Sequence, residues 1–335
     1  VMFLIIRKIY LLLYRTHVNI DVIAGGPPCQ PFSLGGKALG YKDDRDMFPY
    51  AISAIRQLTP KVFIFENVKG LLRQSFARYF SYIILQLTYP HVELKNLDWE
   101  RNLSLLERIH TEGSYKELKY NVIFRLLNAA DYGVPQRRER VVIVGIRNDL
   151  NVAWNFPEGT HSQEALLWDK YVTGSYWERH NLIPPFGEQR QQALQKERLL
   201  SQYGMFPPVK APWQTVRDAL QGLPVPLEAS ESYNEHLLRT GAKEYAGHTG
   251  SDIDQPSKTI KAGGHGVPGG ENMIKYPDGK VRYYTVLEAK RIQTFPDDYS
   301  ISGSWTEAMR QIGNAVPVRL ANVIAESLFK SVFEC

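Results

Sequence analysis

Short apolar runs alternate with helical stretches over the first half of the chain. The runs near residues 20–24, 61–65, 120–127 and 140–146 are rich in β-branched and aromatic residues, so each predicts a buried strand. Residues 47–58 instead have the spacing of a helix. Strands that alternate with helices predict an α/β fold with a doubly wound, Rossmann-like and mostly parallel sheet.

The second half of the chain has a different character. Beyond about residue 150, prolines interrupt regular structure and tryptophans recur, at positions 154, 168, 177 and 213. We therefore expect a first domain over residues 1–150 and a smaller, irregular domain over residues 151–270. Residues 271–335 form a C-terminal segment that we expect to return to the first domain, and its block over residues 285–329 contains two helical segments.

A cysteine follows the first predicted strand at a sharp turn. Residues 25–33 read Gly-Gly-Pro-Pro-Cys-Gln-Pro-Phe-Ser, in which the glycines permit a tight turn and the prolines fix φ. Cys29 would then lie at the carboxyl edge of the sheet, where open α/β folds bind their ligands. For an isolated Pro-Cys pair, a buried cysteine in a proline-rich loop is the simpler interpretation, but further segments favour a nucleophile.

Four such segments follow in order. Residues 61–68 form an apolar strand that ends in Glu-Asn-Val, and residues 136–140 read Gln-Arg-Arg-Glu-Arg before another apolar strand. Residues 291–296 read Arg-Ile-Gln-Thr-Phe-Pro, and residues 311–317 read Gln-Ile-Gly-Asn-Ala-Val-Pro. With the Pro-Cys-Gln turn, these blocks resemble the DNA (cytosine-5) methyltransferase family of bacterial and phage restriction-modification systems. The region over residues 151–270 then resembles that family's target-recognition domain.

The resemblance implies a methyl transfer through a covalent adduct. Carbon 5 of cytosine is a poor nucleophile until a thiolate adds to carbon 6, and Cys29 is the candidate thiolate. Glu66 would donate a proton at ring nitrogen 3, because partial desolvation at its strand end would raise the pKa of its carboxyl group. Asn67 would position the loop that carries Glu66. Arg140 would hold the cytosine carbonyl oxygen, while Arg138 would support the site or a phosphate. Because these two arginines alternate, both can point to one side of the sheet.

The resemblance also implies the cofactor S-adenosylmethionine. Pro28 would back the catalytic turn, Phe48 would pack near the adenosine, and Asn314, Ala315 and Val316 would line the methionine end of the cofactor site.

Duplex DNA is the implied substrate, with the target base flipped out of the helix. Gln30 and Ser33 lie on the loop that would close over that base. Residues 34–46 have the glycines and basic groups of a mobile loop on DNA, although a plain surface loop has the same composition. Thr259 resembles a family threonine that touches the backbone of the target nucleotide.

The N-terminal segment departs from the family pattern. Relatives carry a Phe-x-Gly-x-Gly turn and a ribose-binding acid ahead of the Pro-Cys turn, whereas residues 1–16 contain neither glycine nor acid. We therefore expect an N-terminally truncated cofactor site and severely reduced activity of the chain alone. A separate polypeptide that supplies the missing segment would restore the activity.

Charge and cysteine content agree with an intracellular DNA enzyme. The net charge is +5, which favours a polyanionic partner, but residues 151–255 carry 9 basic and 13 acidic residues. Base reading would thus use a few placed side chains. Two cysteines exclude a disulfide framework, and no apolar run is long enough to span a membrane. We expect a monomer in the bacterial cytoplasm, associated with the nucleoid, without a metal.

Two other functions fit the same sequence. One is the tRNA-methylating branch of the family, which shares the Pro-Pro-Cys turn. The other is a truncated, inactive half-enzyme that binds DNA.

Overall fold

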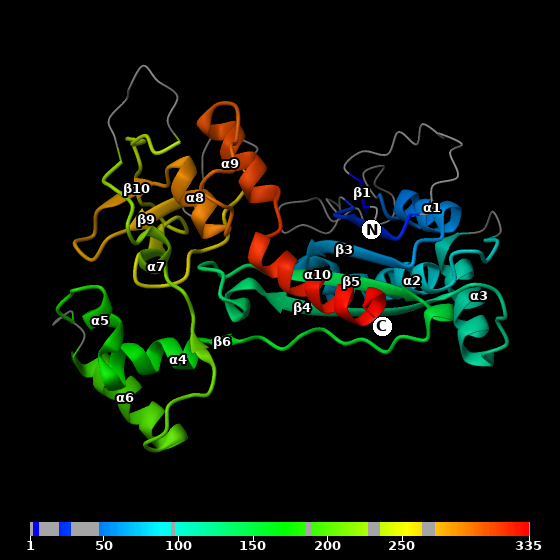
Figure 1. Ribbon diagram of the computed structural model, residues 1–335, viewed down its shortest axis with the longest axis horizontal. Coiled ribbons are helices and arrows are strands. Elements are labelled where there is room, and N and C mark those ends of the chain that lie inside the picture. The colour runs from blue at the N-terminus through cyan, green and yellow to red at the C-terminus, as the bar shows by residue number, and fades with distance from the viewer. Residues whose placement is uncertain are drawn as a thin grey trace. The chain divides into compact units, whose positions relative to one another are not determined.

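The chain forms two compact units in the computed structural model (Figure 1). The first comprises Val1–Leu127, Glu139–Phe156 and Ser327–Cys335, and the second comprises Asn128–Arg138 and Pro157–Glu326. The structure describes residues 3–6, 20–27, 47–94, 98–184, 189–226, 235–262 and 272–334.

A five-stranded mixed sheet organises the first unit. Its strand order is β1-β2-β3-β5-β4, with strands β1 (Phe3–Ile6), β2 (Val22–Gly25), β3 (Val62–Val68), β4 (Tyr120–Asn128) and β5 (Glu139–Arg147). The α/β class and the four expected strands are confirmed. Parallel pairing joins β1, β2 and β3, but β5 runs antiparallel to β3. Only residues 129–138 separate β4 from its neighbour β5, and this connection is shorter than a parallel crossover between these two strands needs.

Three helices share one hydrophobic core with this sheet. They are α1 (Phe48–Leu58), α2 (Ala77–Thr88) and α3 (Trp99–Glu112), and their buried residues pack with Phe63 and Phe65 of β3. The side chain of Asp98 caps α3 by accepting from the Arg101 amide, which satisfies one of the free N–H groups of the first turn. Short 3-10 turns lie at Lys69–Leu72, Gln74–Phe76, Ala129–Tyr132 and Asn148–Leu150.

The second unit contains short strands and helices. Strands β6 (His161–Ser162) and β7 (Ala211–Pro212) pair with each other, and β8 (Ser251–Asp252), β9 (Met273–Lys275) and β10 (Val281–Tyr283) form a three-stranded sheet. The helices are α4 (Gln163–Trp168), which continues as a π-helical turn (Asp169–Thr173), α5 (Ser175–Arg179), α6 (Gln189–Tyr203), α7 (Val216–Leu220), α8 (Val286–Ile292) and α9 (Trp305–Asn314).

The last helix, α10 (Val318–Phe333), belongs to both units. Its residues up to Glu326 count with the second unit, and those from Ser327 with the first. In the first unit the Trp154 indole N–H donates to Ser327 Oγ at 2.9 Å. Across the described ranges, no helix has the length and apolar character needed to cross a bilayer.

Candidate active site

The carboxyl ends of β2 and β3 bring Glu66 and Asn67 beside the start of the Pro-Pro-Cys turn. Gly25 is paired with Phe65 in parallel register. The amide Nδ2 of Asn67, a buried side chain, donates to the Pro27 carbonyl at 3.0 Å, and its Oδ1 accepts from the Val68 amide. A parallel edge therefore places a carboxylate and a turn-binding amide on adjacent positions.

Gly26 permits this close approach. A Cβ at residue 26 would lie 3.3 Å from Oε2 of Glu66, tighter than ordinary van der Waals contact. The predicted residues Pro28, Cys29, Gln30 and Ser33 follow this point and lie outside the described residues.

Arg140 and Glu66 form an ion pair that was not predicted from the sequence. Glu66 is paired with Val142 and Val68 with Arg140 in the antiparallel β3–β5 register, so Glu66 and Arg140 are diagonal neighbours on one face of the sheet. Nε of Arg140 lies 2.6 Å from Oε1 of Glu66, and both side chains are largely buried. Burial lowers the pKa of Arg140 below its ordinary value, an effect that the Glu66 carboxylate opposes.

Arg138 has partners of a different kind. It precedes β5, its side chain is 1% exposed, and Nη2 donates to the carbonyls of Gly313 at 2.9 Å and Ala315 at 3.0 Å. Nη1 makes a longer bond, 3.4 Å, to the Ile260 carbonyl. This buried guanidinium supports a backbone loop and has no exposed surface for the phosphate contact considered from the sequence.

That loop joins the end of α9 to α10. A Cβ at Gly313 would lie 2.5 Å from the Ala262 nitrogen, so only glycine fits without a backbone shift. Beyond it the Asn314 side chain is exposed, and Ala315 and Val316 are partly exposed. These three predicted cofactor residues thus have exposed surface that a ligand can contact. The buried Arg138 side chain binds the backbone of the same turn.

The side chains of Phe48 and Thr259, both predicted to contact a ligand, instead contact other residues of the protein. The Phe48 ring, at the first position of α1, is 0% exposed and belongs to the hydrophobic core, so it has no free face for the adenosine expected there. The Thr259 hydroxyl donates to the Arg137 carbonyl at 2.8 Å. A contact with a nucleotide backbone would have to replace this hydrogen bond.

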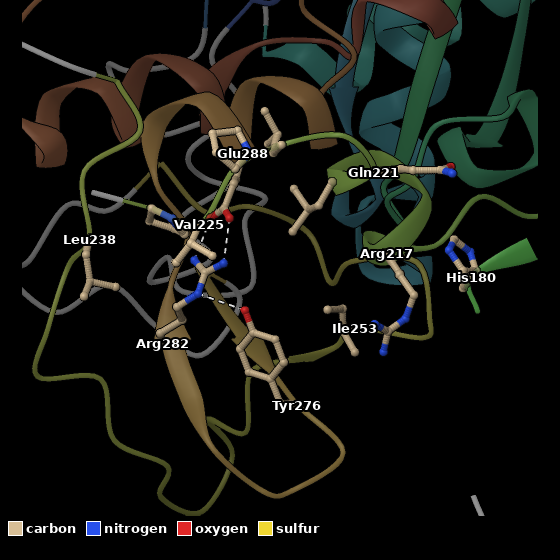
Figure 2. A pocket seen from close by; sticks show the side chains of 13 residues that line it. His180, Arg217, Gln221, Val225, Leu238, Ile253, Tyr276, Arg282 and Glu288 are labelled. Atoms are coloured by element: carbon tan, nitrogen blue, oxygen red, sulfur yellow. Dashed lines mark hydrogen bonds and ion pairs between the residues drawn. The ribbon is translucent and has the colours of Figure 1, made fainter. Parts of the chain in front are cut away.

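A cavity of about 430 Å³ lies elsewhere in the second unit, and none of the predicted site residues that the structure describes lines it. Figure 2 shows Arg282 between Glu288 and Tyr276 at its wall. Arg282 makes two bonds to Glu288, at 2.6 and 2.7 Å, and one to the Tyr276 hydroxyl at 2.9 Å. Arg217, on the same wall, is paired with Asp254 at 2.6 Å. Arg282 and Arg217 are therefore already paired with carboxylates of the protein.

Lys170 is buried next to this wall. Its side chain is 5% exposed, Nζ donates to the Asp254 carbonyl, and Nζ lies 4.7 Å from the centre of the Tyr176 ring. Burial lowers the pKa of Lys170 from 10.5 to about 8, although Asp254, Asp252 and Asp218 oppose the shift. No sequence pattern points to this cluster, because its members lie far apart along the chain.

Comparison with known proteins identifies one family. The family model described as "C-5 cytosine-specific DNA methylase" matches residues 6–89 and 95–330. Type II methyltransferase M.AplI of Arthrospira platensis is 31% identical over 312 residues, which are 92% of this chain and 68% of that protein. Type II methyltransferase M.Eco47II of Escherichia coli is 31% identical over 318 residues, 92% of this chain and 64% of the relative. The chain thus spans about two thirds of the length of these relatives.

Proposed function

Because the chain belongs to the C-5 cytosine-specific DNA methylase family, we propose that it transfers a methyl group from S-adenosylmethionine to carbon 5 of cytosine in duplex DNA. The proposal includes a specific target sequence, as the Type II names of the relatives suggest. The DNA-modifying role also favours the bacterial cytoplasm as its location.

Cys29 is the proposed nucleophile. Its thiolate would add to carbon 6 of the flipped base and make carbon 5 electron-rich enough to accept the methyl group. The hydrogen bond from Asn67 to the Pro27 carbonyl supports this role, because it fixes the backbone two residues before the cysteine. Elimination of the thiolate and loss of the carbon 5 proton would then release the product.

Glu66 and Arg140 are proposed to bind the edge of the cytosine ring. Nitrogen 3 and the carbonyl oxygen on carbon 2 lie side by side on that edge, so a carboxyl group beside a guanidinium matches both positions. Glu66 would stabilise the adduct by proton donation at nitrogen 3, and Arg140 would donate to the carbonyl oxygen. Their contact at 2.6 Å is the observation that carries this proposal. The base would have to replace part of that contact.

The exposed turn after α9 is proposed to contact the cofactor. S-adenosylmethionine supplies an electrophilic methyl group when it is bound. Asn314 would bind its methionine end through its side-chain amide, and Ala315 and Val316 would shape the same surface. Glycine at 313 and the carbonyl contacts of Arg138 support this assignment, since they fix the backbone of the turn.

Sequence recognition is proposed to reside in residues 151–270, between a catalytic domain over 1–150 and a returning segment over 271–335. Residues 151–255 are net acidic, which favours reading by a few placed side chains instead of a broad basic face. Duplex DNA is the proposed partner.

Bisulfite sequencing tests the proposal. Plasmid DNA from a methylation-deficient host that expresses the chain is compared with DNA from hosts expressing Cys29→Ser and Glu66→Gln. We expect methylcytosine in one short sequence context, complete loss with Cys29→Ser and a strong reduction with Glu66→Gln. Unmethylated DNA in the presence of folded protein would contradict the proposal. Methylation of tRNA with DNA untouched would reassign the substrate.

A further inference from the structure

Two residues at the end of α8 contact both sides of the turn that joins α9 to α10. Gln293 is the first residue after α8, and Thr294 follows it. Both belong to the segment Arg-Ile-Gln-Thr-Phe-Pro, to which the proposed chemistry assigns no role. Their contacts all lie within the second unit.

The side chain of Gln293 holds the α9 side of the turn. It is 0% exposed, and Nε2 donates to the Ile312 carbonyl at 2.8 Å and, more weakly, to the Ala315 carbonyl at 3.5 Å. The Ile312 carbonyl already accepts from the Ala315 amide at 3.1 Å, so it does not need the glutamine to be satisfied.

The other end of the Gln293 amide is unsatisfied. Its oxygen, Oε1, is buried without a hydrogen-bond partner among the described residues. An unpaired buried acceptor is costly, and an apolar side chain of similar size would avoid that cost. Packing alone thus does not explain a glutamine at this position, whereas a directional contact to the turn does.

The α10 side of the turn is held by backbone and hydroxyl oxygens. The Gln293 carbonyl accepts from the Val318 amide at 3.1 Å, and Thr294 Oγ1 accepts from the Arg319 amide at 2.9 Å. Val318 and Arg319 begin α10, where N–H groups lack partners within the helix. Gln293 and Thr294 therefore supply these partners from outside.

Thr294 makes its contact from a strained conformation. Its φ is +58°, in the left-handed region that a β-branched residue rarely adopts. The hydroxyl also donates to the Gln293 carbonyl at 2.7 Å, which ties the two residues together. Strain of this kind persists only where the surrounding structure fixes it, and it clusters at functional sites.

We propose that Gln293 and Thr294 are positioning residues for the methyl donor. They fix both ends of the turn over residues 314–317, so that Asn314 is presented to S-adenosylmethionine without a change of backbone conformation on binding. Arg138 holds the same turn through Gly313 and Ala315. This inference rests on the proposed function, because the turn is assigned there to the cofactor.

Gln293→Met is the first test. Methionine keeps the size and removes the donor, and the Ile312 carbonyl keeps its backbone partner. We expect the dissociation constant and the KM for S-adenosylmethionine to rise about 3- to 10-fold, the effect of one lost hydrogen bond. The KM for DNA should stay within about twofold, and Tm within about 3 °C of wild type. Gln57→Met, at an exposed glutamine of α1 that donates to Ser53 in the same helix, should change none of these values.

Thr294→Gly separates positioning from stability. Glycine removes the strain of the positive φ, but it also removes the hydroxyl that accepts a hydrogen bond from the Arg319 amide. We expect Tm to be unchanged or raised while S-adenosylmethionine binds about 3- to 10-fold more weakly. Hydrogen exchange without cofactor should also become faster at the Val318 and Arg319 amides. If the two residues had only a structural role, the affinity for S-adenosylmethionine would fall only in a variant whose Tm also falls.

The outcomes distinguish this inference from the function on which it rests. Wild-type protein that binds S-adenosylmethionine and methylates DNA, together with variants of unchanged cofactor affinity, would overturn the positioning role alone. Folded wild-type protein that neither binds the cofactor in calorimetry nor methylates DNA would overturn both. Weaker binding in both variants at preserved Tm supports the inference.

Discussion

Replacing Lys170 with methionine removes a buried cation from the second unit. Nζ of Lys170 lies over Tyr176 and donates to the Asp254 carbonyl, while the Asp254 carboxylate keeps its own partner in Arg217. Lys170→Met therefore leaves the Asp254 carboxylate paired. Because methionine fills a similar volume, we expect the variant to fold and to be at least as stable as wild type at neutral pH.

The pH dependence gives the magnitude. Burial lowers the pKa of Lys170 to about 8 from its ordinary 10.5, so the unfolded chain binds more protons than the folded chain between these values. Stability then rises with pH across that window, by about 3 kcal/mol in all and by about 2 kcal/mol between pH 8 and about 9.5. Below pH 8 the cost of burying the charged form is fully present. Lys170→Met should lack this rise.

Urea unfolding followed by tryptophan fluorescence measures the effect. Trp168, Trp177 and Trp213 all lie in the second unit and report on it. The comparison is kept below about pH 9.5, because burial raises the pKa of Tyr176 and tyrosine titration in the unfolded chain then lowers stability. Lys196→Met, at an exposed lysine of α6, is the matched control and should follow wild type. Parallel curves for wild type and Lys170→Met would refute the reasoning.

Three further predictions concern the proposed site. Asn67→Leu removes the hydrogen bond to the turn before the cysteine, so kcat for DNA methylation should fall about 3- to 10-fold, and an unchanged kcat would argue against that contact. Gly313→Ala places a Cβ 2.5 Å from the Ala262 nitrogen and should lower the free energy of unfolding by roughly 1–3 kcal/mol in denaturant titrations; a neutral effect would show that the turn can shift. Arg140→Lys should weaken cytosine-dependent DNA binding about tenfold, because the planar fork beside Glu66 is lost, and equal affinity by fluorescence anisotropy would contradict its role.

Arg138 and Arg140 show what a sequence motif can predict and what it cannot. Their spacing in Gln-Arg-Arg-Glu-Arg predicts that both are site residues and that they share one side of the sheet. In the structure Arg140 contacts Glu66, while Arg138 lies before β5 and holds carbonyls of the second unit. The motif points to both arginines, but partners distant in sequence divide their roles.

Local order in the sequence determined the α/β class, the expected strands and the segments that carry the chemistry. Strand runs are readable because alternation and β-branching act over a few residues, and the family blocks are readable because each is contiguous. Glu66, Asn67 and the late Asn314 turn can therefore be picked out from the order of residues alone.

Only the tertiary structure decided which of these groups meet. The antiparallel register of β5 with β3 makes Glu66 and Arg140 diagonal neighbours. Gln293 meets Ile312, and Lys170 meets Asp254, across many residues of intervening chain. Such contacts depend on how separate elements pack and on which buried polar groups need partners, and neither is encoded in the spacing of residues along the chain.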